Sequence, residues 1–139
     1  MLVPKKMIEY NLLYKYMDTK SWGPHGWYFL HTITFNYPDN PSEEHKYFHK
    51  QLFTNFAHTL PCKYCRQSYK KFMMELPIDN YLSSKKHLAL WLYKIHNKVN
   101  DKLKKQGYND NPNPTFHQVC IFYEQFRASC SSSKMTCSF

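Results

Sequence analysis

The chain has 139 residues, which suffices for one domain of ordinary size and leaves no room for a second. Its composition, 42% apolar and 18% aromatic, can supply a core and excludes a globally disordered protein. Only 3 glycines stand against 8 prolines, which argues against a β-sandwich or barrel. The longest purely apolar stretch, residues 88–93, is far shorter than the roughly 20 residues that cross a bilayer. The composition therefore predicts one helical domain with no membrane span.

The chain is strongly basic. With 19 Lys and Arg residues against 10 Asp and Glu residues, the formal net charge is +9, which would suit nucleic acid, an acidic protein or an anionic cofactor. The basic residues occur as scattered Lys-Lys pairs rather than as one tract, so solvated helix faces are the simpler interpretation. Residues 1–20 mix charge and tyrosine throughout, so no secretory signal is expected there.

Turn signals divide the rest of the chain into helices. A first amphipathic segment begins near Ser21, a candidate N-cap, and stops at the proline-rich turn 37–41. Ser42 caps a second segment, 43–58, in which apolar residues recur at helical spacing. Three more helices follow. The first covers 62–76, the second is capped by Ser83 or Ser84 and runs to about Lys105, and the third is capped by Thr115 and runs through Phe126.

These helices predict an all-α fold, a four-helix bundle with a short fifth helix. We expect residues 1–20 to be an N-terminal extension, 21–126 the folded domain, and 127–139 a polar tail that contains cysteine.

One close cysteine pair carries the chemistry. Cys62 and Cys65 lie one turn apart in the first turn of a predicted helix, where the helix dipole favours a thiolate and Lys63 and Arg66 add positive charge. A disulfide between them closes so small a loop that it adds little stability, so a purely structural role is less favoured. The pattern indicates a redox-active dithiol.

Two other interpretations of this pair are weaker. A zinc site needs two more ligands, and no second Cys-x-x-Cys or matching histidine pair follows at finger spacing, so no metal is expected. A thioredoxin-like motif would follow a β-strand, and none is predicted.

Aromatic residues suggest an electron acceptor for the dithiol. Trp22 and Trp27 stand near His31, and Trp91 stands near His96, on helix faces that the apolar stripes turn inward. A planar cofactor could stack there, although each tryptophan alone would suit an ordinary core.

Three blocks in order resemble the Erv/ALR family of FAD-linked sulfhydryl oxidases. They read WGPHGWYFLH at 22–31, PCKYC at 61–65 and WLYKIHNKVNDKL at 91–103. The small size and the Leu-Pro-Cys junction at 60–62 look most like the compact members of large DNA viruses.

The resemblance implies a thiol oxidase that forms disulfides in protein substrates and passes the electrons to FAD and then to O2, giving H2O2. It places FAD at one end of the bundle, with Cys65 beside the flavin and Cys62 exchanging with incoming thiols. The cofactor-binding residues that it implies are Trp22, Gly23, Trp27, His31, Trp91, His96, Asn97, Val99, Asn100, Lys102 and Lys105.

The chain departs from the family pattern in its other cysteines. Many cellular members have a cysteine at the position of Tyr93, bonded to a downstream cysteine, so that disulfide is missing here. Many also have a shuttle cysteine pair on a flexible arm. Cys130 and Cys137 in the serine-rich tail are the candidates, although Cys120 could pair with either or with neither.

The resemblance also implies a homodimer, with protein thiols or a redox relay protein as partners and with nucleic acid not expected. A viral member would act in the host cytoplasm or the virion. The alternative is a basic helical module without catalysis that binds nucleic acid or an acidic partner, and this alternative predicts a colourless protein.

Overall fold

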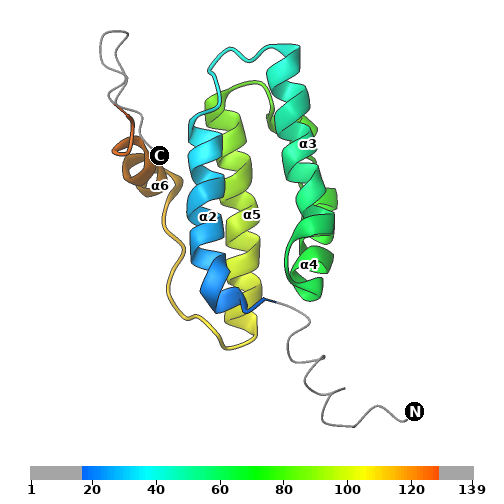
Figure 1. The fold of residues 1–139 in the computed structure, drawn as a ribbon. Coiled ribbons are helices and arrows are strands. Elements are labelled where there is room, and N and C mark those ends of the chain that lie inside the picture. Colours follow the sequence, from blue (N-terminus) through cyan, green and yellow to red (C-terminus); the bar gives the residue numbers. More distant parts are fainter. Residues whose placement is uncertain (1–16, 129–139) are drawn as a thin grey trace, which may run out of the picture.

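The computed structural model describes residues 17–128, and every regular element in this range is helical. The predicted all-α fold is confirmed. The elements, shown in Figure 1, are α2 (Thr19–Phe35), α3 (Glu43–Thr59), α4 (Lys63–Glu75), the short 3-10 helix η1 (Ile78–Tyr81), α5 (Lys85–Lys105) and α6 (Phe116–Glu124).

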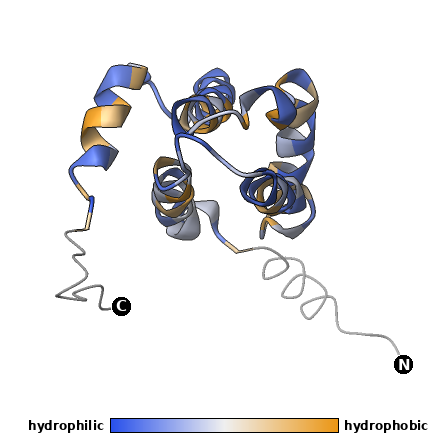
Figure 2. Cartoon of the chain, turned by 90° about the horizontal axis from the view of Figure 1, so that it is seen from above, coloured by the Kyte–Doolittle hydropathy of each residue, from blue (hydrophilic) through white to orange (hydrophobic). Residues whose placement is uncertain are grey.

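Helices α2 to α5 form an up-and-down bundle, and the short helix α6 lies outside it beside α2 (Figure 1). The view from above in Figure 2 shows the four bundle helices end-on with α6 to one side. Because successive helices alternate in direction, the start of α2, the end of α3, the start of α4 and the end of α5 meet at one end of the bundle.

Side-chain caps set where the helices begin. Ser42, Ser84 and Thr115 each accept a hydrogen bond from a backbone N–H of the first turn. Ser42 and Thr115 are the caps that the sequence predicted, and of the two candidates Ser83 and Ser84 it is Ser84 that caps α5. The first helix differs, because Asp18 rather than Ser21 is its N-cap and the helix continues through Pro24. Asp18 Oδ1 accepts from Lys20 N at 3.1 Å. Helix α2 therefore begins three residues earlier than expected.

The main core lies around α5. Leu88, Trp91, Leu92 and Ile95 are fully buried, and Trp91 meets the ring of Phe53 edge-on at 5.2 Å. None of the helices among residues 17–128 is both long enough and apolar enough to span a bilayer.

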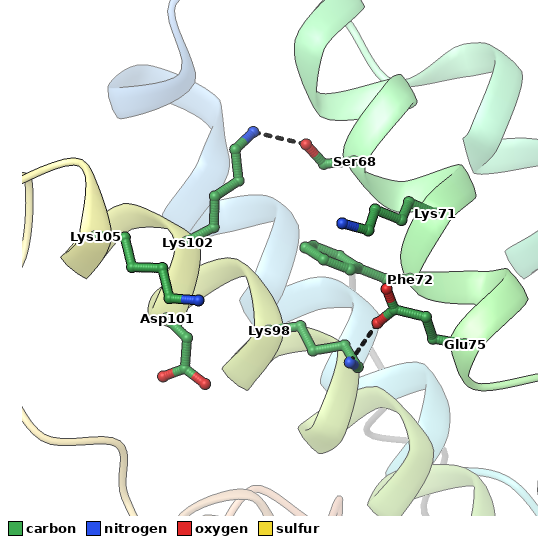
Figure 3. Close-up of a pocket in the computed structure, with 8 residues that line it drawn as sticks. All are labelled: Ser68, Lys71, Phe72, Glu75, Lys98, Asp101, Lys102 and Lys105. Carbon is green, nitrogen blue, oxygen red and sulfur yellow. Dashed lines mark hydrogen bonds and ion pairs between the residues drawn. The ribbon is translucent and has the colours of Figure 1, made fainter.

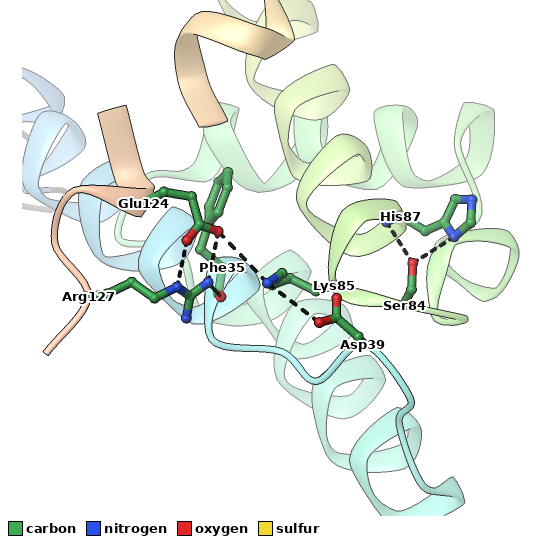
Figure 4. A network of polar contacts seen from close by, with 7 residues as sticks. All are labelled: Phe35, Asp39, Ser84, Lys85, His87, Glu124 and Arg127. Carbon is green, nitrogen blue, oxygen red and sulfur yellow. Dashed lines mark hydrogen bonds and ion pairs between the residues drawn. The ribbon is translucent and has the colours of Figure 1, made fainter. Parts of the chain in front are cut away.

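A smaller core joins α6 to the bundle through Phe35, Ala89 and Val119. A polar network closes its edge (Figure 4). Arg127 pairs with Glu124 and donates to the Phe35 carbonyl at 2.7 Å. These contacts hold the end of α6 against the end of α2.

Tyr37 closes the turn between α2 and α3. Its hydroxyl is buried and donates to the Leu82 carbonyl at 2.9 Å. Replacing Tyr37 by phenylalanine leaves that carbonyl unpaired, and we expect the free energy of unfolding to fall by about 1–3 kcal/mol. Urea unfolding measures this loss. The exposed Tyr47→Phe is the matched control, and an equal effect of the two variants would contradict this role of Tyr37.

Candidate active site

The cysteine pair lies at the start of α4, where Pro61 separates α3 from α4. Cys62 is the N-cap, with extended backbone, and its Sγ accepts a hydrogen bond from Cys65 N at 3.3 Å. Both cysteines are free thiols; Cys62 is 9% exposed and Cys65 is half-buried. The prediction that both lie in the first turn holds, with Cys62 one position before the helix.

The electrostatics at Cys65 differ from the expectation. Burial is the largest cause that raises the pKa of Cys65, to about 12, and the neighbouring Cys62 adds to it. Lys102 acts in the opposite direction but is outweighed. The prediction of a thiolate-favouring environment is therefore wrong for Cys65 in the dithiol form, because burial and the adjacent sulfur prevail over the positive charges.

Three predicted rings meet between α2 and α5. Trp27 stacks on His96 at a centroid distance of 3.9 Å, and His31 Nε2 lies 3.0 Å from His96 Nδ1. Tyr123 of α6 stacks on the other side of His31 at 5.0 Å. His31 Nδ1 is buried and has no hydrogen-bond partner. The cluster therefore holds one unpaired polar atom within an aromatic surround.

Both histidines of this cluster are neutral. Burial, and to a smaller extent the nearby His96, lowers the pKa of His31 to about 3. Burial alone lowers the pKa of His96 to about 4. One ring must donate and the other accept in the bond that joins them, since neither carries a second proton.

A groove of about 470 Å³ runs between α4 and α5 (Figure 3). Lys102 Nζ donates to Ser68 Oγ at 2.6 Å across it, and Lys98 pairs with Glu75 further along. Ser68 follows Cys65 by one turn of α4. The residues that line the groove are Ser68, Lys71, Phe72, Glu75, Lys98, Asp101, Lys102 and Lys105.

The remaining predicted site residues are more dispersed. Trp22 Nε1 donates to the Met17 carbonyl at 3.2 Å, and Asn100 donates to the side chain of Asn113 at 3.1 Å. Trp91 lies apart, since its ring is fully buried in the core and its Nε1 donates to the Leu76 carbonyl. The other predicted residues, all half-buried, are Gly23, Asn97 and Val99. Cys130 and Cys137 lie outside the described residues.

Comparison with known proteins identifies the family of this chain. The sequence pattern of the Erv1/Alr family matches residues 24–123, about seven tenths of the chain. The chain belongs to the Erv1/Alr family. The Erv/ALR resemblance seen in the three sequence blocks is thereby confirmed.

Relatives of this Erv1/Alr chain occur in viruses and in eukaryotes. The probable FAD-linked sulfhydryl oxidase of Acanthamoeba polyphaga mimivirus is 39% identical over 85 residues, covering 60% of this chain and 59% of the relative. The mitochondrial FAD-linked sulfhydryl oxidase ERV1 of Saccharomyces cerevisiae is 32% identical over 94 residues, covering 68% of this chain and 49% of the relative. The chain thus spans about half to three fifths of these two relatives.

Solved structures support the same family. The crystal structure of the yeast Erv1 core superimposes with a TM-score of 0.70 at 26% identity, covering 81% of this chain and 88% of that one. At the position of Tyr93, this Erv1/Alr chain joins α5 to the segment before α6 without a covalent bond. The Tyr93 hydroxyl donates to the Pro114 carbonyl at 2.8 Å, and its ring meets Phe116 at 5.4 Å.

Sequence reasoning missed several members of the site in this Erv1/Alr chain. The sequence places Ser68 and Tyr123 only within predicted helices and Lys71 only on a solvated helix face, and it gives the groove lysine Lys98 no role of its own. Ser68 was within reach, because it lies at i+3 from Cys65 and so on the same face. Tyr123 was not, because no local pattern indicates that α6 packs on His31. Within residues 17–128, no three or more His, Cys, Asp and Glu side chains gather in a way that would hold a metal ion.

Proposed function

We propose that this chain is an FAD-linked sulfhydryl oxidase that forms disulfide bonds in protein substrates. The observation that carries the proposal is the dithiol of Cys62 and Cys65 at the N-terminus of α4, with Lys102 of α5 acting on Cys65 at the same end of the bundle. Its membership of the Erv1/Alr family and its similarity to FAD-linked sulfhydryl oxidases of a virus and of yeast support the same function.

The exchange between thiols takes place on the cysteine pair. In the oxidised pair, a substrate thiolate attacks Cys62 Sγ, the bond between the two sulfurs breaks, and Cys65 leaves as a thiolate. A second substrate thiolate then attacks the mixed disulfide, and Cys62 leaves with the electron pair of that bond. The substrate is oxidised by two electrons and the cysteine pair is reduced by two. Lys102 stabilises the Cys65 thiolate, since its charge lowers the pKa of that thiol.

The residues between α2 and α5, together with the groove between α4 and α5, fit FAD. The buried, unpaired His31 Nδ1 offers a hydrogen bond that nothing in the described chain takes up, within a surround of stacked rings. The cations Lys102 and Lys105, which line the groove, suit a pyrophosphate. When bound, FAD accepts the electron pair of a dithiol and passes it to O2, giving H2O2.

We propose that the residues holding FAD are those that the family pattern implies. They are Trp22, Gly23, Trp27, His31, His96, Asn97, Val99, Asn100, Lys102 and Lys105. Trp91 contributes by holding α5 in place, since its ring fills the core against Phe53.

The absorption spectrum of the purified protein, followed by oxygen uptake with dithiothreitol, tests this function. We expect a flavin band near ~450 nm and oxygen consumption. Cys120→Ser removes a thiol of α6 outside the redox pair and is expected to keep both properties. A colourless protein that takes up no FAD would overturn the proposal and favour a basic module that binds nucleic acid or an acidic partner.

We propose that the protein acts as a homodimer. Exposed apolar side chains on α2 and α3 support this, among them Phe29, Tyr47 and Phe48, which is 58% exposed. Replacing Phe48 by glutamate is expected to lower the solution mass from that of a dimer to that of a monomer, because it buries a charge in the contact. Sedimentation equilibrium measures this, with Lys86→Glu as control. A wild-type monomer would contradict the dimer.

We further propose that residues 21–126 are the catalytic domain, that residues 1–20 are an extension and that residues 127–139 are a tail. In this tail, Cys130 and Cys137 shuttle electrons from substrates or a relay protein to Cys62. The described helices begin at Thr19 and end at Glu124, which supports these bounds. The viral relatives support action in host cytoplasm or virion. Replacing both tail cysteines by serine should slow oxidation of protein thiols and leave oxidation of dithiothreitol unchanged.

A further inference from the structure

The outer face of α4 is cationic. Its charged residues before the last position are Lys63, Arg66, Lys70 and Lys71, and its only carboxylate, Glu75, is its final residue. Lys63, Lys70 and Lys71 are exposed. The helix that begins with the redox pair therefore carries an excess of positive charge.

The spacing of these residues places the charge along one side of the helix. Lys63, Gln67, Lys70 and Met74 recur at intervals of three and four, so they form one row that starts beside Cys62. Two apolar side chains accompany the row, since Tyr64 is 67% exposed and Met74 is 76% exposed. This mixture of cations and exposed apolar groups is suited to a polypeptide rather than to solvent alone.

Local carboxylates leave most of this charge uncompensated. Among the ion pairs within residues 17–128, none includes Lys63, Lys70 or Lys71. Glu75 is held by Lys98 of α5, although Lys71 also acts on it at longer range. Asp18, which the bond from Met17 N to the Pro61 carbonyl brings near Cys62, is the cap of α2. The positive charge of these lysines is therefore available to attract a carboxylate of another molecule.

We propose that this cationic face of α4 (Lys63, Gln67, Lys70 and Lys71) docks acidic segments that flank the reactive thiols of protein substrates. The proposal rests on the sulfhydryl oxidase function proposed above and names the class of its substrate. The row starts beside Cys62. A substrate segment docked along the row therefore has its thiol close to Cys62 Sγ, the sulfur with which that thiol exchanges.

A cationic face beside Cys62 assists the thiol exchange. The thiolate is the attacking species, and neighbouring carboxylates disfavour a thiolate by like-charge repulsion. A cationic surface beside Cys62 offsets this repulsion for a docked acidic segment, and it also raises the rate of encounter. Nucleic acid would use the same charges, but it has no reason to be held beside a redox pair.

The test measures exchange with matched dithiol peptides whose flanking residues are acidic, neutral or basic. The full-length protein, oxidised at Cys62 and Cys65, is mixed with each peptide under nitrogen, and loss of its disulfide is followed by thiol alkylation. This single-turnover readout does not need the flavin. Oxygen uptake with dithiothreitol, measured separately, reports whether the proposed oxidase function itself holds.

The variants Lys70→Glu and Gln67→Glu/Lys70→Glu change the charge of the row without touching the redox pair or the groove. We expect them to slow exchange with the acidic peptide by about threefold and about tenfold, to reduce the preference for acidic over basic peptides, and to leave dithiothreitol oxidation unchanged. The effect should shrink in high salt. Lys86→Glu on α5 makes the same charge change as Lys70→Glu on an exposed position outside the face.

Equal exchange rates for the three wild-type peptides would overturn the proposal, even if oxygen uptake shows an active oxidase. So would equal effects of Lys86→Glu and Lys70→Glu, which would indicate net charge alone. If Lys70→Glu leaves peptide exchange unchanged but weakens the binding of a single-stranded oligonucleotide, the face binds nucleic acid and the proposal is wrong. Failure of oxygen uptake with charge-dependent exchange retained would overturn only the oxidase function.

Discussion

Replacing Cys65 by serine is expected to lower dithiol-driven oxygen uptake by at least about a thousandfold, since no disulfide can form within the pair. The variant keeps Cys62, whose sulfur accepts from the backbone N–H of residue 65, a donor that serine also supplies. When the substrate is supplied as its disulfide, the Cys62 thiolate attacks one substrate sulfur, the other substrate sulfur leaves as a thiolate, and residue 65 has no sulfur with which to resolve the mixed disulfide. The measurement is oxygen uptake together with mass spectrometry of trapped adducts.

Cys62→Ser is the matched variant for this experiment. It should lose oxygen uptake to the same extent but trap far less substrate, because burial, the largest cause that raises the pKa of the Cys65 thiol, remains when Cys62 is replaced. Equal trapping by the two variants would contradict the assignment of Cys62 as the exchanging sulfur. A Cys65→Ser variant with unchanged turnover would contradict the redox role of the pair.

Acidification is expected to destabilise the protein through the pair of buried histidines. The pKa values of His31 and His96 are about 3 and about 4 in the folded chain, against the ordinary histidine value of 6.5. Below about pH 6.5, His31 and His96 therefore bind protons in the unfolded chain that they do not bind in the folded chain. Each histidine should lower the free energy of unfolding by about 1.4 kcal/mol per pH unit as the pH falls from about 6.5 toward 4.

Chemical denaturation at pH 7, 6 and 5 measures this slope. His31→Phe keeps a ring beside Tyr123 and removes one titrating group, so the slope should fall by about half in this window. The exposed His25→Gln is the control and should leave the slope unchanged. A slope that persists in a variant lacking both His31 and His96 would show that other groups cause the acid sensitivity.

The fold was largely predictable because its signals are local. Capping serines and threonine at 42, 84 and 115, with prolines between the helices, define where most helices begin. The first helix was misplaced, since Asp18 competes with Ser21 as a cap and Pro24 is tolerated inside the helix. The bundle topology then follows from short connections, which favour antiparallel neighbours.

The site was only partly predictable because its contacts are distant in sequence. The Cys62–Cys65 spacing and the motif around His96 indicate chemistry directly. By contrast, the pairing of His31 with His96 spans 65 residues, and the contact of Tyr123 with His31 depends on where α6 packs. The raised pKa of Cys65 also escaped prediction, because burial of a side chain within the first turn of a helix cannot be read from its charged neighbours.

The capping role of Cys62 provides a built-in reporter of oxidation state. In the dithiol form, the Cys65 amide proton is directed at the sulfur of Cys62. A disulfide between the same two residues moves that sulfur and changes the electron density that the amide proton experiences. The backbone resonance of residue 65 in a nitrogen-15 spectrum should therefore shift between the two forms, so that the redox equilibrium can be followed without any added dye or alkylating agent.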